Sequence, residues 1–214
     1  MALTKFNYNS FDVTSAASKG LAFNSSANGF ETATEGSMVL IKTLTASTSS
    51  TLSFVDGSSS VVLDNTYPVY LFKFINCHPD ASDAQFGFQV STNTGSSYGV
   101  SITSTAIEAF NAGVQYGGNN DLYNGTGLQF ITNTVYHSRA EESMNGTLHL
   151  FNPSSTTFVK HFISRASRMN NTNFAEHLHA GYVNSTSAVD AVQFKFANGN
   201  ISTGTIKLYG IKDS

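Results

Sequence analysis

Apolar and polar residues alternate with a period of two in almost every ordered-looking part of the chain. In the segment Tyr67–Asn76 the pattern places Tyr70, Phe72 and Phe74 on one face and Leu71, Lys73 and Ile75 on the other. Such alternation is typical of β-strands in which one face is buried. The same pattern predicts strands in these segments: Ser37–Thr45, Thr51–Val55, Tyr67–Asn76, Ala84–Thr92, Gly146–Asn152, Thr157–Ser164, Ala188–Ala197 and Gly204–Ile211. Their spacing, roughly 8–12 residues in several blocks, favours an all-β antiparallel sandwich.

Two stretches depart from this alternation. Residues 1–36 are polar with isolated aromatics, which predicts an N-terminal arm or edge segment used for docking or oligomer contact. Residues 93–145 are rich in Gly and Asn and are expected to form long exposed loops. Within them, Thr105–Gly113 predicts one short helix, with Thr105 as the N-cap and Gly113 just past the end. Because no linker interrupts the rest, residues 37–214 are expected to form a single β-sandwich domain.

The charge content narrows the function classes. Charged residues make up 12% of the 214 residues and the net charge is −3, with no basic cluster, so nucleic-acid binding through phosphate contacts is not expected. A surface so poor in charge suits a subunit whose natural state is an assembly, although many monomeric β proteins are also rich in Ser and Thr.

Cysteine content and hydropathy point to a compartment. Cys77 is the single cysteine, which leaves no internal disulfide. No apolar run approaches the roughly 18 residues of a membrane span, and the N-terminal segment lacks the apolar core of a secretion signal. Folding in a reducing cytoplasm, without membrane insertion, is therefore expected.

The stretch His149–Arg165 contains residue types used in nucleophilic catalysis. A Ser-His pair needs a carboxylate to orient the base, and no Asp or Glu lies between Ser143 and Ser164. Asn152 and Pro153 instead suit the first two positions of a type I turn. We interpret the stretch as a β-hairpin, and the sequence predicts no catalytic residue.

A second cluster, Glu176–His179, raises the question of a metal. In a strand His177 and His179 share one face about 7 Å apart and could ligate one ion. A cupin-like metal site would need a further ligand, for which His137, His149 and His161 are available. The pair is a weak metal candidate, and the alternative is that both are surface or interface histidines. No cofactor is predicted.

Aromatic residues in the Gly/Asn-rich region suggest another activity. Tyr98, Tyr116 and Tyr123 could stack on sugar rings and contact a host glycan if their loops are exposed. The alternative is an ordered surface loop or a subunit contact.

Several blocks together resemble small structural proteins of tailed phages, especially marine phages such as those that infect cyanobacteria. These blocks are "MALTKFNYNSFDVT", "GLAFNSSANGF", "GSMVLIKTLTAS", "STLSFVDGSSSVVLDNTYPVYLFKFINCHPDASDAQFGFQVS", "LFNPSSTTFVKHFISR" and "AGYVNSTSAVDAVQFKFANGNISTGTIKLYGI". They cover most of the chain apart from about residues 95–145. The set is specific, whereas each block alone is little more than a β pattern.

The resemblance implies a jelly-roll or related β-sandwich on the exterior of a virion. It further implies a non-enzymatic subunit that is assembled in the host bacterial cytoplasm, as a homotrimer or other symmetric homo-oligomer in contact with other capsid or tail proteins. Two roles stay open: a capsid decoration or head fibre, and a tail fibre, adaptor or carbohydrate-binding receptor tip. The family has no catalytic motif to transfer to this chain.

Overall fold

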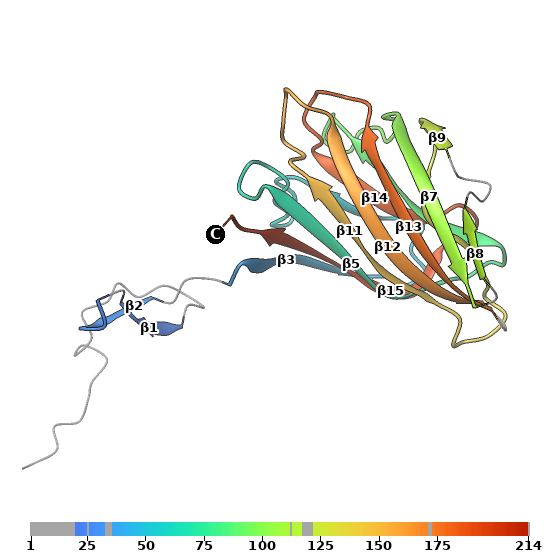
Figure 1. Cartoon of the computed structure of the whole chain (residues 1–214), viewed down its shortest axis with the longest axis horizontal. Coiled ribbons are helices and arrows are strands. Elements are labelled where there is room, and N and C mark those ends of the chain that lie inside the picture. Colours follow the sequence, from blue (N-terminus) through green and yellow to red (C-terminus); the bar gives the residue numbers. More distant parts are fainter. Residues whose placement is uncertain are drawn as a thin grey trace, which may run out of the picture.

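A computed structural model describes residues 20–24, 26–32, 36–111, 113–116, 122–170 and 173–213, and the side chains of residues 113–116, 122, 123 and 170 lie outside the description. The described residues form strands and no helix (Figure 1). The strands are β1 (Leu21–Phe23), β2 (Phe30–Thr32), β3 (Met38–Thr45), β4 (Leu52–Val55), β5 (Val69–Pro79), β6 (Ala84–Ser91), β7 (Ile102–Phe110), β8 (Gly113–Tyr116), β9 (Leu122–Gly125), β10 (Gln129–Val135), β11 (Met144–Phe151), β12 (Lys160–Asn170), β13 (Asn173–Val183), β14 (Ala191–Phe196) and β15 (Ile201–Ile211).

Two antiparallel sheets pack face to face. The smaller has the order β10-β6-β14-β4, and the larger has the order β3-β15-β5-β11-β12-β13-β7-β8, with β9 also paired to β7. Every strand pair is antiparallel. The predicted all-β antiparallel sandwich is therefore confirmed.

The order of the strands along the chain divides the sandwich into a frame and an extension. The frame consists of eight strands, which lie as β3-β15-β5-β11 in one sheet and β4-β14-β6-β10 in the other. The chain adds β7–β9 between β6 and β10, and β12–β13 between β11 and β14. These two insertions pair with each other through β13 and β7, and so extend the larger sheet beyond β11.

Phenylalanine fills the interior of the frame. Phe194 of β14 is fully buried, and its ring centroid lies within 5.0–6.4 Å of the centroids of five other rings. Those five rings belong to Phe54, Phe72, Phe74, Phe86 and Phe88. The predicted alternation of the Tyr67–Asn76 segment is confirmed, and the face with Tyr70, Phe72 and Phe74 is the buried one.

The predicted helix at Thr105–Gly113 is wrong. Its residues up to Phe110 belong to strand β7, which pairs with β13 over nine residue pairs. Ala and Glu favour a helix locally, but the ladder to β13 and the burial of Ile102, Ser104 and Glu108 on one face override that preference.

The long loop region predicted at about 93–145 is also wrong in large part. It contains strands β7, β8, β9 and β10 and the first residues of β11. Strand β13 was not among the predicted strands either. In β7 and β13 the inward positions include Ser104, Glu108, His177 and His179, so a clear apolar alternation is missing there.

The N-terminal region is described only in part, since residues 1–19, 25 and 33–35 lie outside the described residues. In the remainder, β1 and β2 form a hairpin with Leu21 opposite Thr32 and Phe23 opposite Phe30. The hairpin pairs with none of the other described strands. The division into an arm at 1–36 and a single domain at 37–214 stays a prediction. No described helix could span a membrane.

Candidate functional site

His177 and His179 point into the sandwich from β13. They are 2% and 4% exposed, and their ring centroids lie 6.3 Å apart. Both therefore lie on one face of a strand, as the sequence suggested. The alternative interpretation as surface histidines is wrong, because the inward face of β13 is covered.

Charged side chains from the neighbouring strands β7 and β12 lie close to His177. Glu108 of β7 lies directly opposite it in the sheet, and its Oε1 is 3.4 Å from His177 Nε2. Arg168 of β12 donates from Nη2 to the same oxygen at 3.3 Å, and Asn133 of β10 donates to Glu108 Oε2 at 3.4 Å. Glu108, Arg168, His177 and His179 form what we call the buried polar cluster.

Burial keeps both imidazoles neutral. Desolvation, reinforced by the positive charge of Arg168 and then by His179, lowers the pKa of His177 to about 3. Desolvation alone lowers the pKa of His179 to about 4. Burial also lowers the pKa of Arg168, against the opposing effect of the Glu108 carboxylate. At neutral pH the cluster therefore holds one ion pair and two uncharged rings.

Several atoms of the cluster lack hydrogen-bond partners among the described residues. They are Arg168 Nε and Nη1, His177 Nε2 and His179 Nδ1, and the hydroxyl of Ser164, which lies opposite His179 on β12, also lacks a partner. Because a buried polar atom without a partner costs about 1–3 kcal/mol, the region is under-satisfied compared with an ordinary core.

The other histidines do not join this pair. His137 forms a hydrogen bond with the Ser82 hydroxyl, and His161 lies against Tyr182 at a centroid distance of 5.9 Å. His149 lies opposite Ile163, which is on the solvent face of the large sheet. Within the described ranges, no three His, Cys, Asp or Glu side chains are grouped as metal ligands. The guanidinium of Arg168 would also repel a cation at His177. The suggested metal assignment stays a prediction, with no third ligand among these residues.

The stretch His149–Arg165 is a hairpin, as predicted. Strands β11 and β12 pair antiparallel, and the N–H of Ser155 donates to the carbonyl of Asn152 at 3.1 Å across the turn. The hydroxyl of Ser155 accepts the N–H groups of Thr157 and Phe158. That serine therefore stabilises the turn.

The three tyrosines suggested for glycan contact have different outcomes. Tyr98 is half-buried, and its carbonyl accepts a hydrogen bond from the Gln89 side chain at 2.8 Å. Tyr116 and Tyr123 belong to strands β8 and β9 rather than to a loop, and their side chains lie outside the described part of the chain. Their role in glycan contact stays a prediction.

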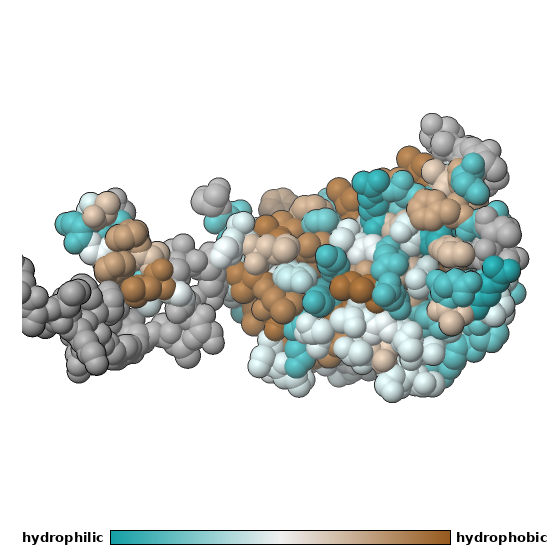
Figure 2. All heavy atoms as spheres, turned by 90° about the horizontal axis from the view of Figure 1, so that it is seen from below, coloured by the Kyte–Doolittle hydropathy of each residue, from teal (hydrophilic) through white to brown (hydrophobic). Residues whose placement is uncertain are grey.

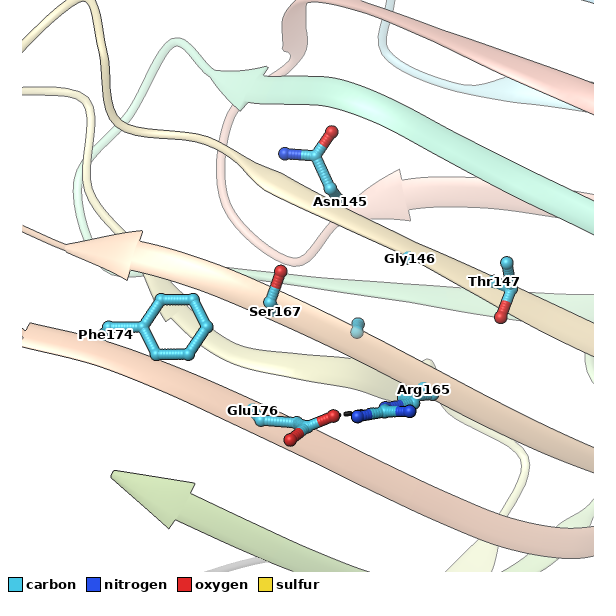
Figure 3. A pocket seen from close by; sticks show the side chains of 8 residues that line it. Asn145, Gly146, Thr147, Arg165, Ser167, Phe174 and Glu176 are labelled. Carbon is cyan, nitrogen blue, oxygen red and sulfur yellow. Dashed lines mark hydrogen bonds and ion pairs between the residues drawn. The ribbon is translucent and has the colours of Figure 1, made fainter. Parts of the chain in front are cut away.

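Sequence reasoning missed an open depression on the solvent face of the large sheet. It has a volume of about 490 Å³ and lies over β11, β12 and β13 (Figure 3). Its principal side chains are Asn145, Thr147, Arg165, Ser167, Phe174 and Glu176. The outward alternation of β12 could have placed Arg165 and Ser167 on one face, but only the register of three strands brings all six together.

Comparisons with protein-family models, with curated proteins and with solved structures find no match for this chain.

Proposed function

We propose that the chain is a non-enzymatic structural subunit of a tailed-phage virion, exposed on the particle exterior as a homo-oligomeric capsid decoration or head-fibre component. The phage assignment rests on the resemblance of the sequence blocks. The assembly role rests on apolar surface that is exposed among the described residues of one copy.

The strand order of the frame supports a jelly roll. In a jelly roll, eight strands form two four-stranded sheets, and the chain crosses between them so that its first strand pairs with its last. Here β3 pairs with β15, β4 with β14, and β5 lies between β15 and β11. Viral capsid domains, lectins and cupins use this arrangement.

The observation that carries the assembly role is the apolar N-terminal hairpin. Phe23 and Phe30 stack with a centroid distance of 4.9 Å, yet they are 69% and 41% exposed. A two-stranded hairpin is marginally stable alone in water, so the exposed part of the Phe23 ring favours contact with another surface. We assign that surface to a neighbouring subunit of the particle.

Strand β3 adds a second uncovered surface. It is an edge strand of the large sheet with no partner on its outer side among the described strands. Met38 and Leu40 on it are about half exposed, at 53% and 51%. In Figure 2 apolar residues gather on the part of the sandwich next to this strand. A long apolar edge strand favours pairing with another chain, here a second copy.

The oligomeric state tests the assembly role. Sedimentation of the full chain should give a closed oligomer, and a Phe23→Ser/Phe30→Ser double variant should shift it towards smaller species or abolish its attachment to particles. Phe158→Ser, which changes an equally exposed aromatic in the β11–β12 turn, is the matched control. A wild-type chain that is a stable monomer and is absent from mass spectra of purified particles would sink the proposal.

A tail fibre, adaptor or receptor-binding tip is the alternative placement. The depression over β11–β13 favours it, because a receptor-binding protein needs an open, polar surface site. Density for the chain in a reconstruction of intact particles separates the two placements by location and copy number.

A further inference from the structure

The depression over β11–β13 is built from ordered rows of side chains. Asn145, Ser167 and Glu176 lie directly opposite one another on three adjacent strands. We call them the polar row. Side chains in such positions point to the same face, so the polar row spans two inter-strand spacings, ~10 Å.

An aromatic side chain lies on one side of the polar row, and a hydroxyl and a guanidinium lie on the other. On one side Phe174 lies opposite Met169 and is 52% exposed. On the other side Thr147 lies opposite Arg165. Figure 3 shows the Phe174 ring beside Ser167 and Glu176, with Arg165 further along the strands.

The floor of the depression is backbone rather than side chain. Gly146 and Ala166 line it and lie opposite each other between the outward-facing pairs Asn145–Ser167 and Thr147–Arg165, so they present backbone to it. Ala166 itself is buried and small. The sheet surface is therefore shallow here, and a flat ring can approach it.

Two contacts hold the polar groups in place before any ligand binds. Arg165 donates from Nε to Glu176 Oε1, and this exposed ion pair joins the two strands. The Asn145 amide oxygen accepts the backbone N–H of Asn76 at 2.9 Å, which fixes the amide. Preorganised polar groups of this kind lower the entropic cost of binding.

The charge of the site is balanced. Its lining residues contain one guanidinium and one carboxylate, and these pair with each other. The remaining polar groups are an amide and two hydroxyls. An anionic ligand gains little net attraction here, whereas a neutral ligand with many hydroxyls finds both donors and acceptors.

We infer that this depression is a binding site for a neutral saccharide, with one sugar face packed on Phe174 and the sugar hydroxyls hydrogen-bonded to the polar row, Thr147 and Arg165. A pyranose combines an apolar C–H face with a rim of hydroxyls, which matches an exposed aromatic beside an amide, a carboxylate and a guanidinium. The site goes beyond the structural role and does not depend on it.

The test uses the isolated full chain. Its binding to maltose, cellobiose, lactose and N,N′-diacetylchitobiose at millimolar concentrations is measured by ligand-observed NMR, alongside a glycan array. At least one neutral glycan should bind, and Phe174→Ala should weaken that binding by about tenfold or more. Glu176→Gln, which removes the ion pair at constant size, should weaken it less.

Two matched variants separate this site from other surfaces. Phe158→Ala removes an aromatic that is 69% exposed elsewhere, and Tyr98→Ala removes the described tyrosine of the earlier candidate region. Phe158→Ala should leave binding unchanged, whereas loss of binding in Tyr98→Ala would place the saccharide at the earlier candidate tyrosines. Circular dichroism checks that each variant is folded.

Three outcomes overturn the inference: no glycan binds, binding survives Phe174→Ala in the folded variant, or Tyr98→Ala removes it instead. Because the assay contains no particle and does not depend on oligomeric state, its failure is distinguishable from failure of the virion proposal.

Discussion

The frame and the extension differ in the side chains that fill their interiors. Aromatic rings fill the interior of the frame, whereas charged and polar side chains are buried in the extension. Between β5, β6 and β14 the sheets are joined by interlocking phenylalanines around Phe194. Between β10 and the inserted strands the buried positions include Glu108, Arg168, His177 and His179. The first interior gains stability from burial of apolar area and packing, and the second depends on pairing of groups that are costly to desolvate.

This difference predicts how substitutions and pH affect the stability of each region. Substitutions in the interior of the frame should lower the free energy of unfolding by a similar amount at every pH, because apolar side chains do not titrate. In the extension, the loss of stability should depend on whether a substitution leaves a buried charge without its partner. It should also depend on pH.

The largest effect is expected for Phe194→Ala. This ring is fully buried against five others, so its truncation should lower the free energy of unfolding by ~3–5 kcal/mol. Urea denaturation measures it. Phe158→Ala, at a site 69% exposed, should change stability by less than ~0.5 kcal/mol. Similar losses for the two variants would refute the aromatic interior described above.

Glu108→Gln should lower the free energy of unfolding by roughly 3 kcal/mol, somewhat less than Phe194→Ala. The reason is that it leaves the Arg168 guanidinium buried without its counter-charge. Adding Arg168→Met to the same chain should recover much of the loss, since no unpaired charge then remains. A double-mutant cycle on unfolding free energies gives the coupling, and strict additivity would contradict a shared ion pair.

Acid should weaken the extension through its histidines. The pKa of His179 is about 4 in the folded chain and about 6.5 in an unfolded chain, so the unfolded state binds the proton first as the pH falls. The stability present above pH 6.5 is therefore lost progressively towards pH 4. Between pH 7 and pH 5 the wild type should lose about 2 kcal/mol more than His179→Gln. Parallel pH profiles for the two proteins would contradict the burial of a neutral ring.

The smallest effect is expected in the labelling rate of Cys77. This buried thiol lies in the apolar interior and can be used to measure how often that interior opens. Burial raises the pKa of its thiol to about 12, so a thiol reagent at neutral pH should react only when the region opens. Labelling rates in the native state should be alike for the wild type and Glu108→Gln if the two interiors open independently. A much faster rate in the variant would show that they open as one unit.

The sequence was informative where one face of a strand is apolar. Tyr70, Phe72 and Phe74 alternate clearly, and the hairpin around Asn152 has its own turn chemistry, so both were predicted correctly. The segment Thr105–Gly113 resembles a helix in sequence because the inward positions of β7 include Ser104 and Glu108, and that inward face becomes apparent only when β13 is paired beside it.

The candidate sites depend even more on register. Spacing alone places His177 and His179 on one face, but their burial beside Arg168 depends on how β12, β13 and β7 align. The polar row joins Asn145, Ser167 and Glu176 from three strands, and no local pattern links these positions.

The pairing of β13 with β7 has a consequence for how this fold can change over evolutionary time. Either insertion taken alone would present half of an ion pair: β7 would carry Glu108 without Arg168, and β12–β13 would carry Arg168 and two histidines without the carboxylate. The two segments are separated in the chain by β10 and β11, yet each holds the charge partner of the other. We therefore expect the two insertions to be kept or lost together, because loss of only one would leave a buried charge without its partner.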